Sequence, residues 1–217
     1  MKKNTTLTLI TLLTAAVSAN AAIVGFEAES GTLGANFDPV HTDIDALGGE
    51  YITTEVNQGG IVAANIVTYS VNFAETGTYD LYGKIYIGSG GSLDDSFFYG
   101  SDFATTPSIQ VNGIDSTQSG GVASNEVYVW LNFSDFTGTF GDPGVTFTVA
   151  AGDLTTDPTF QIAGRENGLR FDAFAFGTTG ETFSDAQLDA AVIPEPGTYA
   201  LLAGCFALAS VMIRRRR

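Results

Sequence analysis

Short runs of alternating polarity, each followed by a cluster of turn-forming residues, occupy most of the middle of the sequence. The clusters include ETGT, GSGG, VNGID and GDPG, and the runs between them are about five to ten residues long, as strands usually are. In the run TYDLYGKIYI, one face carries Tyr79, Leu81, Gly83, Ile85 and Ile87, and the other carries Asp80, Tyr82, Lys84 and Tyr86. This period of two is typical of a β-strand with one covered face. Many such strands predict an all-β fold, and their spacing favours a β-sandwich over a barrel.

Three further segments extend this pattern. In VYVWLNF, one face holds Val127, Val129, Leu131 and Phe133, and the opposite face holds Tyr128, Trp130 and Asn132. PTFQIAG and GLRFDAFAF are also predicted strands, and the turn RENG joins them. A short helical turn is expected only around FSDAQLDAA.

The first 22 residues have the features of a cleaved secretory signal peptide. Lys2 and Lys3 precede an apolar run from Leu7 to Val17, and small residues follow it as far as Ala22. The run is too short to span a bilayer comfortably. The sequence therefore predicts an exported protein that loses this segment rather than one that keeps it as an anchor.

The last 24 residues combine a turn, an apolar stretch and a basic tail. The turn is Pro194, Glu195 and Pro196, the uncharged stretch is 198–213, and the tail is Arg214, Arg215, Arg216 and Arg217. As a helix the stretch is about 24 Å long, which is shorter than the roughly 30 Å hydrocarbon core of a bilayer. A thinned bilayer or snorkelling ends can accommodate the difference. The arginines stay on the cytoplasmic side, so the preceding domain lies outside.

In combination, these C-terminal features resemble a PEP-CTERM sorting signal; an ordinary membrane anchor is the alternative. The resemblance implies recognition and cleavage by an exosortase-type enzyme in a Gram-negative bacterium that makes exopolysaccharide. The transmembrane helix is then a transient inner-membrane device, and the product reaches the cell surface or the extracellular matrix. The expected organisation is a signal peptide at 1–22, a β-sandwich at 23–180, a linker at 181–193 and the sorting signal at 194–217.

The charge of the exported part excludes one class of partner. The two terminal segments contain six of the nine basic residues, so that Lys84, Arg165 and Arg170 face 23 of the 24 acidic residues, a net charge of −20. Nucleic-acid binding requires the opposite sign. An acidic surface is compatible with divalent cations and also simply keeps a secreted protein soluble. The single cysteine, Cys205, lies in the apolar tail, so the exported domain has no internal disulfide.

Two glutamates near the start of the sandwich form the first candidate site. In GFEAES, Glu27 and Glu29 are two residues apart and are expected on the same side of a first strand, with Phe26 and Ala28 turned toward the core. Parallel carboxylates repel unless a cation lies between them, and Ca²⁺ prefers several oxygen ligands. Asp172 completes such a site if the first and last strands are neighbours. The alternative is a pair of solvated carboxylates that protect a strand edge.

Other acidic residues and the one histidine offer weaker catalytic possibilities. A glycosidase uses two carboxyl groups in a deep cleft, and a small single sandwich is not expected to form such a cleft. Asp94 and Asp95 lie in a loop and are expected to be solvated turn residues. His41 permits one triad formally, but no nucleophile elbow surrounds it. Asp43 and Asp45 lie in a segment that lacks the glutamate and the helices of an EF-hand, so we expect them at most to donate extra oxygens.

Trp130 is the only tryptophan. On the face opposite Leu131, its indole is either a platform on which a sugar ring stacks or a packing residue that covers the second face of a sheet. The sequence favours packing over sugar stacking, and Trp130 remains the candidate ligand contact.

The order of several segments resembles carbohydrate-binding modules of families 6 and 35 and their galactose-binding-like relatives. These segments are FEAES, GGEYIT, TYSVNFAETGTYDLYGKIY, DDSFFY and the long closing stretch to RFDAFAF, which contains Arg165, Glu166, Gly168 and Asp172. The resemblance implies a jelly-roll β-sandwich that binds sugar and holds a structural Ca²⁺ through Glu27, Glu29 and Asp172. The family's polar sugar contact, usually an Asn near the last strand, has no counterpart in DAFAFGTTG.

We therefore expect an exported, noncatalytic β-sandwich that binds polysaccharide at the cell surface. One alternative is an envelope or matrix protein that makes protein contacts without binding sugar. Another is a small polysaccharide-active enzyme that uses an acidic pair.

Overall fold

The structure is a computed structural model that describes residues 23–37, 39–122 and 126–193. The predicted signal peptide, the sorting residues Pro194 to Pro196 and Arg214 to Arg217, and Cys205 lie outside these residues. Within the described ranges, no helix has the length and apolarity needed to cross a bilayer.

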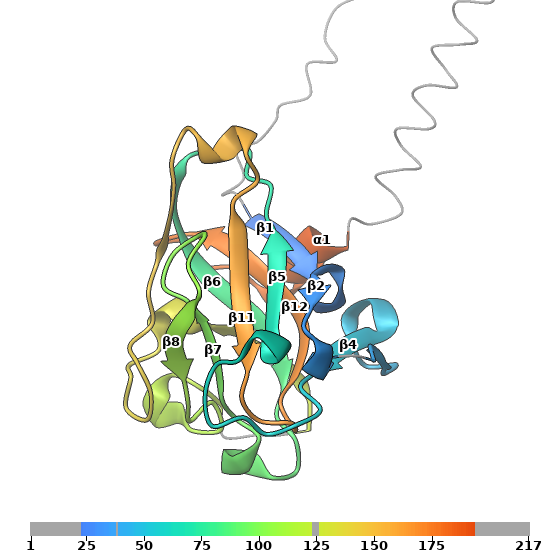
Figure 1. The fold of residues 1–217 in the computed structure, drawn as a ribbon. Coiled ribbons are helices and arrows are strands. Elements are labelled where there is room, and N and C mark those ends of the chain that lie inside the picture. Colours follow the sequence, from blue (N-terminus) through green and yellow to red (C-terminus); the bar gives the residue numbers. More distant parts are fainter. Residues whose placement is uncertain (1–22, 38, 123–125, 194–217) are drawn as a thin grey trace, which may run out of the picture.

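Two antiparallel β-sheets face each other, as expected for a β-sandwich (Figure 1). Sheet A contains β1 (Ile23–Glu27), β3 (His41–Thr42), β4 (Glu50–Thr53), β6 (Gly77–Tyr86), β9 (Tyr128–Asn132), β10 (Phe147–Val149) and β12 (Arg170–Thr178). Sheet B runs in the order β2 (Thr32–Leu33), β5 (Ile66–Ser70), β11 (Thr159–Gly164), β7 (Phe97–Gly100) and β8 (Pro107–Val111). The predicted strands PTFQIAG and GLRFDAFAF are thus β11 and β12, and the turn between them crosses from one sheet to the other.

Short turns and one α-helix connect and cover the strands. Those among the described residues are the 3-10 turns η1 (Ala28–Ser30), η2 (Ala35–Phe37), η3 (Leu47–Gly49), η4 (Ala63–Asn65), η5 (Gly91–Leu93), η6 (Thr117–Ser119), η7 (Phe133–Asp135) and η8 (Asp153–Thr155), and the helix α1 (Asp185–Val192). The helix begins at a capping box made by Ser184 and Gln187, which satisfies free N–H groups at its start. It lies in the range predicted as a linker.

Aromatic rings fill the space between the two sheets. Phe160 from sheet B meets Phe174 and Phe176 from sheet A edge to face, with ring centroids 5.9 and 5.2 Å apart. Each such pair adds about 0.5–1.5 kcal/mol beyond the burial of its area. The face predicted from the alternation in β6 is confirmed, because Tyr79, Leu81, Ile85 and Ile87 all lie in this core.

The opposite face of sheet A is covered as well. Helix α1 packs there through Leu188 and Val192, against Ala173, Ala175 and Trp130. The small alanines of β12 leave room for the helix. The outer face of sheet A is therefore partly a second, smaller core.

Candidate functional site

The edge of β12 changes partner at Asp172. Before this residue in the sequence, β12 pairs with β4 at Arg170 and Phe171. After it, from Ala173 onward, β12 pairs with β1. The register against β6 shifts between Phe171 and Ala173, which is a β-bulge and re-aims the side chain at that position. The first and last strands are thus neighbours, which is the condition under which Asp172 can complete the predicted site.

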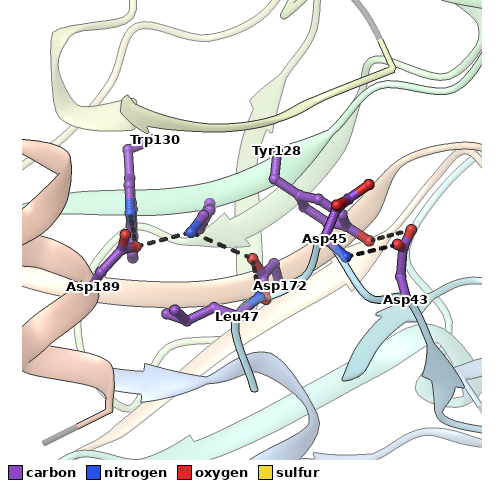
Figure 2. Close-up of polar contacts among 8 residues, drawn as sticks. Asp43, Asp45, Leu47, Tyr128, Trp130, Asp172 and Asp189 are labelled. Carbon is purple, nitrogen blue, oxygen red and sulfur yellow. Dashed lines mark hydrogen bonds and ion pairs between the residues drawn. The ribbon is translucent and has the colours of Figure 1, made fainter. Parts of the chain in front are cut away.

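Asp172 is fully buried and hydrogen-bonded to a loop. Its Oδ1 and Oδ2 both accept from the Leu47 N–H of η3, at 2.9 and 3.0 Å (Figure 2). Burial raises the pKa of Asp172 to about 6, whereas this N–H and then the charge of Lys84 oppose the rise. The side chain therefore fixes η3 against the sheet.

Glu27 and Glu29 do not share one strand face, contrary to the prediction. Strand β1 ends at Glu27, which pairs with Ala173, and Glu29 lies in the following 3-10 turn η1. Ala28 is fully buried, as expected. The turn still keeps both carboxylates close enough for the charge of Glu29 to raise the pKa of Glu27.

Burial and mutual repulsion make these carboxylates costly to ionise. Burial, then the charges of Glu29 and Asp172, raise the pKa of Glu27 to about 8. The Oε2 atoms of Glu27 and Glu29 are buried and have no hydrogen-bond partner. A Cβ placed on Gly48 would stand 2.7 Å from Glu27 Oε1, so η3 closes directly over this carboxylate. We call Glu27, Glu29 and Asp172 the carboxylate cluster.

Lys84 is the cation nearest to this cluster. Its Nζ lies 3.9 Å from Asp172 Oδ2 and 2.9 Å from Asp189 Oδ1 in α1. The same Asp189 oxygen accepts from Trp130 Nε1 at 2.8 Å (Figure 2). Lys84 therefore pairs with Asp172 and Asp189, whereas no ion pair among the described residues involves Glu27 or Glu29.

The donor chemistry of the cluster suits Ca²⁺, but its atoms are not arranged as a finished metal site. All three side chains offer oxygens, which are the ligands that a hard cation such as Ca²⁺ prefers. Two of those oxygens are buried and accept no hydrogen bond, so they are free to act as ligands. Among the described residues, however, no three Asp, Glu, His or Cys side chains stand together in a way that could hold a metal ion. An ion at this point would have to draw the two glutamates toward Asp172.

Trp130 is used for packing in this structure. It is 9% exposed, lies under α1 and donates its indole N–H to Asp189. This matches the packing alternative for Trp130, because the helix covers the indole and leaves no free ring face for a sugar.

A pocket lined by tyrosines lies beside Lys84 and was not predicted. It has a volume of about 250 Å³ and is lined by Asp43, Asp45, Lys84, Tyr86, Glu126, Val127 and Tyr128. Tyr86 and Tyr128 are opposite each other in β6 and β9, with ring centroids 5.3 Å apart. The alternation placed both tyrosines on outward faces, which was a usable signal. We call this the tyrosine pocket.

Arg170 holds the tyrosines in place. Its guanidinium lies over the rings of Tyr51 and Tyr86, 4.7 and 4.2 Å from their centroids, and Nη1 is 2.8 Å from Asp43 Oδ2. Cation–π contacts of this kind contribute about 0.5–2 kcal/mol each. Asp43 is therefore an ion-pair partner in this structure. Asp45 lines the pocket, and its backbone N–H donates to Asp43 Oδ1 (Figure 2).

The other residues that were considered for a catalytic role lie outside both the carboxylate cluster and the tyrosine pocket. His41 bonds Glu55 at 2.6 Å and stacks on Tyr51. The expectation that Asp95 is a solvated turn residue is wrong: it is 1% exposed, because Glu166 of the RENG turn accepts from its backbone N–H at 2.7 Å and closes the loop. Burial, then Asp115, raises the pKa of Asp95 to about 7. Asp94 accepts from the Gly90 N–H at 2.8 Å, a turn contact of the kind expected.

Comparison with known proteins gives no match in sequence and several in structure. No protein-family profile and no curated protein matches the sequence. Similar solved structures include a GH26-CBM35 β-(1,4)-mannanase from Podospora anserina, with 14% identity, a TM-score of 0.47, and coverage of 76% of this chain and 29% of that one. An exo-β-1,3-galactanase from Phanerochaete chrysosporium has 14% identity and a TM-score of 0.41, over 72% of this chain and 29% of that one.

A third similar structure is a carbohydrate-binding module alone. It is CBM6cm-2 from the Cellvibrio mixtus lichenase 5A in complex with cellotriose, with 12% identity, a TM-score of 0.40, and coverage of 72% of this chain and 97% of that one. The chain thus spans less than a third of the two enzymes and nearly the whole of this module. The structural neighbours of the chain include carbohydrate-binding modules of families 6 and 35.

Proposed function

We propose that this protein is an exported, noncatalytic carbohydrate-binding domain with a jelly-roll β-sandwich, and that polysaccharide binds in the tyrosine pocket. The observation that carries the proposal is the pairing of Tyr86 with Tyr128 next to charged side chains in one cavity. Aromatic rings pack on the C–H faces of sugar rings, and carboxylates accept hydrogen bonds from sugar hydroxyls. Sites of this composition take a ligand that is apolar on one side and rich in hydroxyl groups on the other.

The size and charge of the pocket favour a neutral polysaccharide of which only a short part contacts the pocket. A volume of about 250 Å³ is below the range of about 300–1,000 Å³ of enclosed small-molecule sites, which suits contact with part of a long chain. The lining of the pocket has only one basic residue, Lys84, and three acidic residues, Asp43, Asp45 and Glu126. A polyanionic polysaccharide would meet repulsion here.

The small size of the pocket supports the noncatalytic role that we propose, because about 250 Å³ is less than the cleft in which a glycosidase encloses its substrate. Asp43 is tied to Arg170 at 2.8 Å, and none of the residues that line the tyrosine pocket belongs to the carboxylate cluster. A glycosidase needs one free acid and one free carboxylate on either side of the bond. The other carboxylates that line the pocket, Asp45 and Glu126, serve in this proposal to accept hydrogen bonds from sugar hydroxyls.

The carboxylate cluster supplies a structural calcium site in this proposal. Glu27, Glu29 and Asp172 would hold the ion, whose charge would neutralise the cluster. The excess of carboxylates over Lys84 and the unpaired Oε2 atoms of both glutamates support it. The role is structural, since these residues join β1, η1 and β12.

Export and sorting complete the proposal. The N-terminal segment 1–22 directs secretion, and segment 194–217, with Pro194-Glu195-Pro196 and the terminal arginines, directs the chain to an exosortase-type enzyme at the inner membrane. The processed domain then works at the cell surface or in the extracellular matrix. This rests on the resemblance of the tail to a PEP-CTERM signal and on the acidic composition of the exported part.

Affinity electrophoresis of the full chain in gels containing β-glucan, xylan or galactomannan tests sugar binding. We expect at least one gel to retard the parent, Tyr128→Ala and Tyr86→Ala to run as in a sugar-free gel, and the exposed-aromatic control Phe140→Ala to be retarded like the parent. Phe140 is 49% exposed and does not line the pocket. Retardation by none of the gels would favour a matrix protein without sugar binding, and equal retardation of all variants would place the site elsewhere.

A further inference from the structure

A separate cavity lies on the outer face of sheet A, beside β6 and β9. It has a volume of about 540 Å³ and lies between strands β6 and β9 and the segment that follows β12. Its lining residues include Asp80, Tyr82, Asn132, Asp135, Glu181 and Phe183. None of its lining residues lines the tyrosine pocket. We call it the β6–β9 cavity.

The segment after the last strand builds one wall of this cavity. The Thr179 N–H donates to Thr78 O at 2.9 Å, and its hydroxyl donates to Asp80 Oδ1 at 2.8 Å. Phe183 then packs edge to face on Tyr82, with ring centroids 5.9 Å apart. A Cβ on Gly177 would collide with the Phe183 ring, so glycine is needed for this close approach. The wall is therefore fixed by specific contacts and is not a loose tail.

The opposite wall is equally well supported. Asn132 pairs with Tyr82 across β6 and β9, and its amide donates to Asp135 Oδ2 at 2.9 Å and to the Tyr82 hydroxyl at 3.4 Å. Its own Oδ1 accepts from the Ser134 N–H. Because the amide is fully used, the groups left to meet a ligand are mainly carboxylate and hydroxyl oxygens, which accept hydrogen bonds.

The cavity carries negative charge that the protein does not balance. Asp80, Asp135 and Glu181 line it, and no lining residue is basic. The basic side chains of the described residues have acidic partners elsewhere: Lys84 with Asp189, Arg165 with Glu166, Arg170 with Asp43, and His41 with Glu55. Burial, followed by the charges of Asp80 and Asp135, raises the pKa of Tyr82 to about 12. A ligand that fits must donate hydrogen bonds and benefits from a positive charge.

We propose that the β6–β9 cavity is a second saccharide site, and that it takes a sugar with a free amino group. The volume lies within the range of small-molecule sites, the Tyr82 and Phe183 rings give an apolar wall, and the carboxylates pair with an ammonium group through charge-assisted hydrogen bonds. The site is separate from the tyrosine pocket, so the inference goes beyond the proposed function and does not depend on it.

Calorimetric titration of the full chain with three tetrasaccharides tests this inference. They are the β-1,4-linked tetramer of glucosamine, the same tetramer fully N-acetylated, and cellotetraose. We expect the glucosamine tetramer to bind at least tenfold more tightly than the other two, and Asp135→Asn and Glu181→Gln each to weaken it about tenfold, in line with the strength of a charged hydrogen bond. Both side chains are exposed, so these variants should fold.

Two controls distinguish binding in this cavity from general attraction to an acidic surface and from binding in the tyrosine pocket. Glu75→Gln removes the same charge from an exposed position outside the cavity lining and should leave the affinity unchanged. An equal loss in Glu75→Gln would mean general attraction to an acidic protein and would overturn the proposal, as would equal affinity for the N-acetylated tetramer. Tyr128→Phe should leave glucosamine binding unchanged even if it weakens neutral polysaccharide, which distinguishes failure here from failure of the proposed function.

Discussion

Replacing Glu27 by Gln should stabilise the protein without calcium and remove most of the stabilisation that calcium gives. The carboxyl of Glu27 is half-buried, and burial together with Glu29 and Asp172 raises its pKa from 4.5 to about 8. Without metal at pH 7, the folded chain keeps this group protonated, whereas the unfolded chain releases the proton. The folded state therefore carries a cost that the neutral, similarly shaped Gln removes.

The size of the effect follows from the two pKa values. Between the unfolded value of 4.5 and pH 7, each pH unit costs the folded state at most about 1.4 kcal/mol, which sets an upper limit of about 3 kcal/mol. Because the side chain is only half-buried, solvent screening lowers this cost, and Glu27→Gln should stabilise the metal-free chain by about 1–2 kcal/mol. At 100 times the dissociation constant, calcium adds about 2.7 kcal/mol to the parent. The Glu27→Gln variant loses a ligand and should gain little. The parent should thus be the less stable protein in chelator and recover that loss in calcium.

Urea unfolding of the full chain at pH 7, in chelator and in millimolar calcium, measures both differences. Glu75→Gln, at an exposed position, controls for the loss of one negative charge and should match the parent in both buffers. Our reasoning is refuted if calcium leaves the parent unchanged, or if Glu27→Gln is less stable than the parent by the same amount in both conditions.

Three further changes test other parts of the structure. The pKa of Asp95 is raised to about 7, so the folded state binds this proton more tightly than the unfolded state. The free energy of unfolding should therefore fall as the pH rises from about 4 to 7. In urea titrations, Asp95→Asn should flatten that fall by up to about 1.4 kcal/mol per pH unit. Lys84→Met should destabilise the metal-free chain by about 3 kcal/mol in the same assay, since it leaves Asp172 and Asp189 without their cation. Arg170→Ala frees the Tyr86 ring and breaks the pair with Asp43, so we expect at least a tenfold loss of polysaccharide affinity with a melting temperature lowered by only a few degrees.

The sequence predicted those parts of the fold that depend on local alternation. In β6 the period of two assigned Tyr79, Leu81 and Ile85 to the core, because each side chain in a regular strand points opposite to its neighbours. In β12 the core residues Phe171 and Phe174 are three apart, a spacing that alternation cannot yield. The bulge at Asp172 causes it, and a bulge depends on how two other strands share one edge.

The candidate sites were harder to predict because they depend on contacts between distant segments. Asp95 looks like a loop residue in sequence, but Glu166, 71 residues later, covers it. Trp130 alternates outward as predicted, yet α1 returns to cover it. The tyrosine pocket joins β6, β9 and the loop before β4, so that its members carry no common motif. Only the outward direction of Tyr86 and Tyr128 was visible beforehand.

Lys84 makes the two proposed binding events depend on each other. Its ammonium lies 3.9 Å from Asp172 of the carboxylate cluster, and the same side chain lines the tyrosine pocket. A calcium ion on the cluster would take over the neutralisation of Asp172. Lys84, still paired with Asp189 at 2.9 Å, would then turn one of its remaining N–H groups from Asp172 to a sugar hydroxyl. Since coupling between two ligands is reciprocal, polysaccharide must then raise calcium affinity by the same factor by which calcium raises polysaccharide affinity. Equal sugar affinities in calcium and in chelator, with calcium binding shown by the melting curve, would mean that Lys84 does not connect the sites.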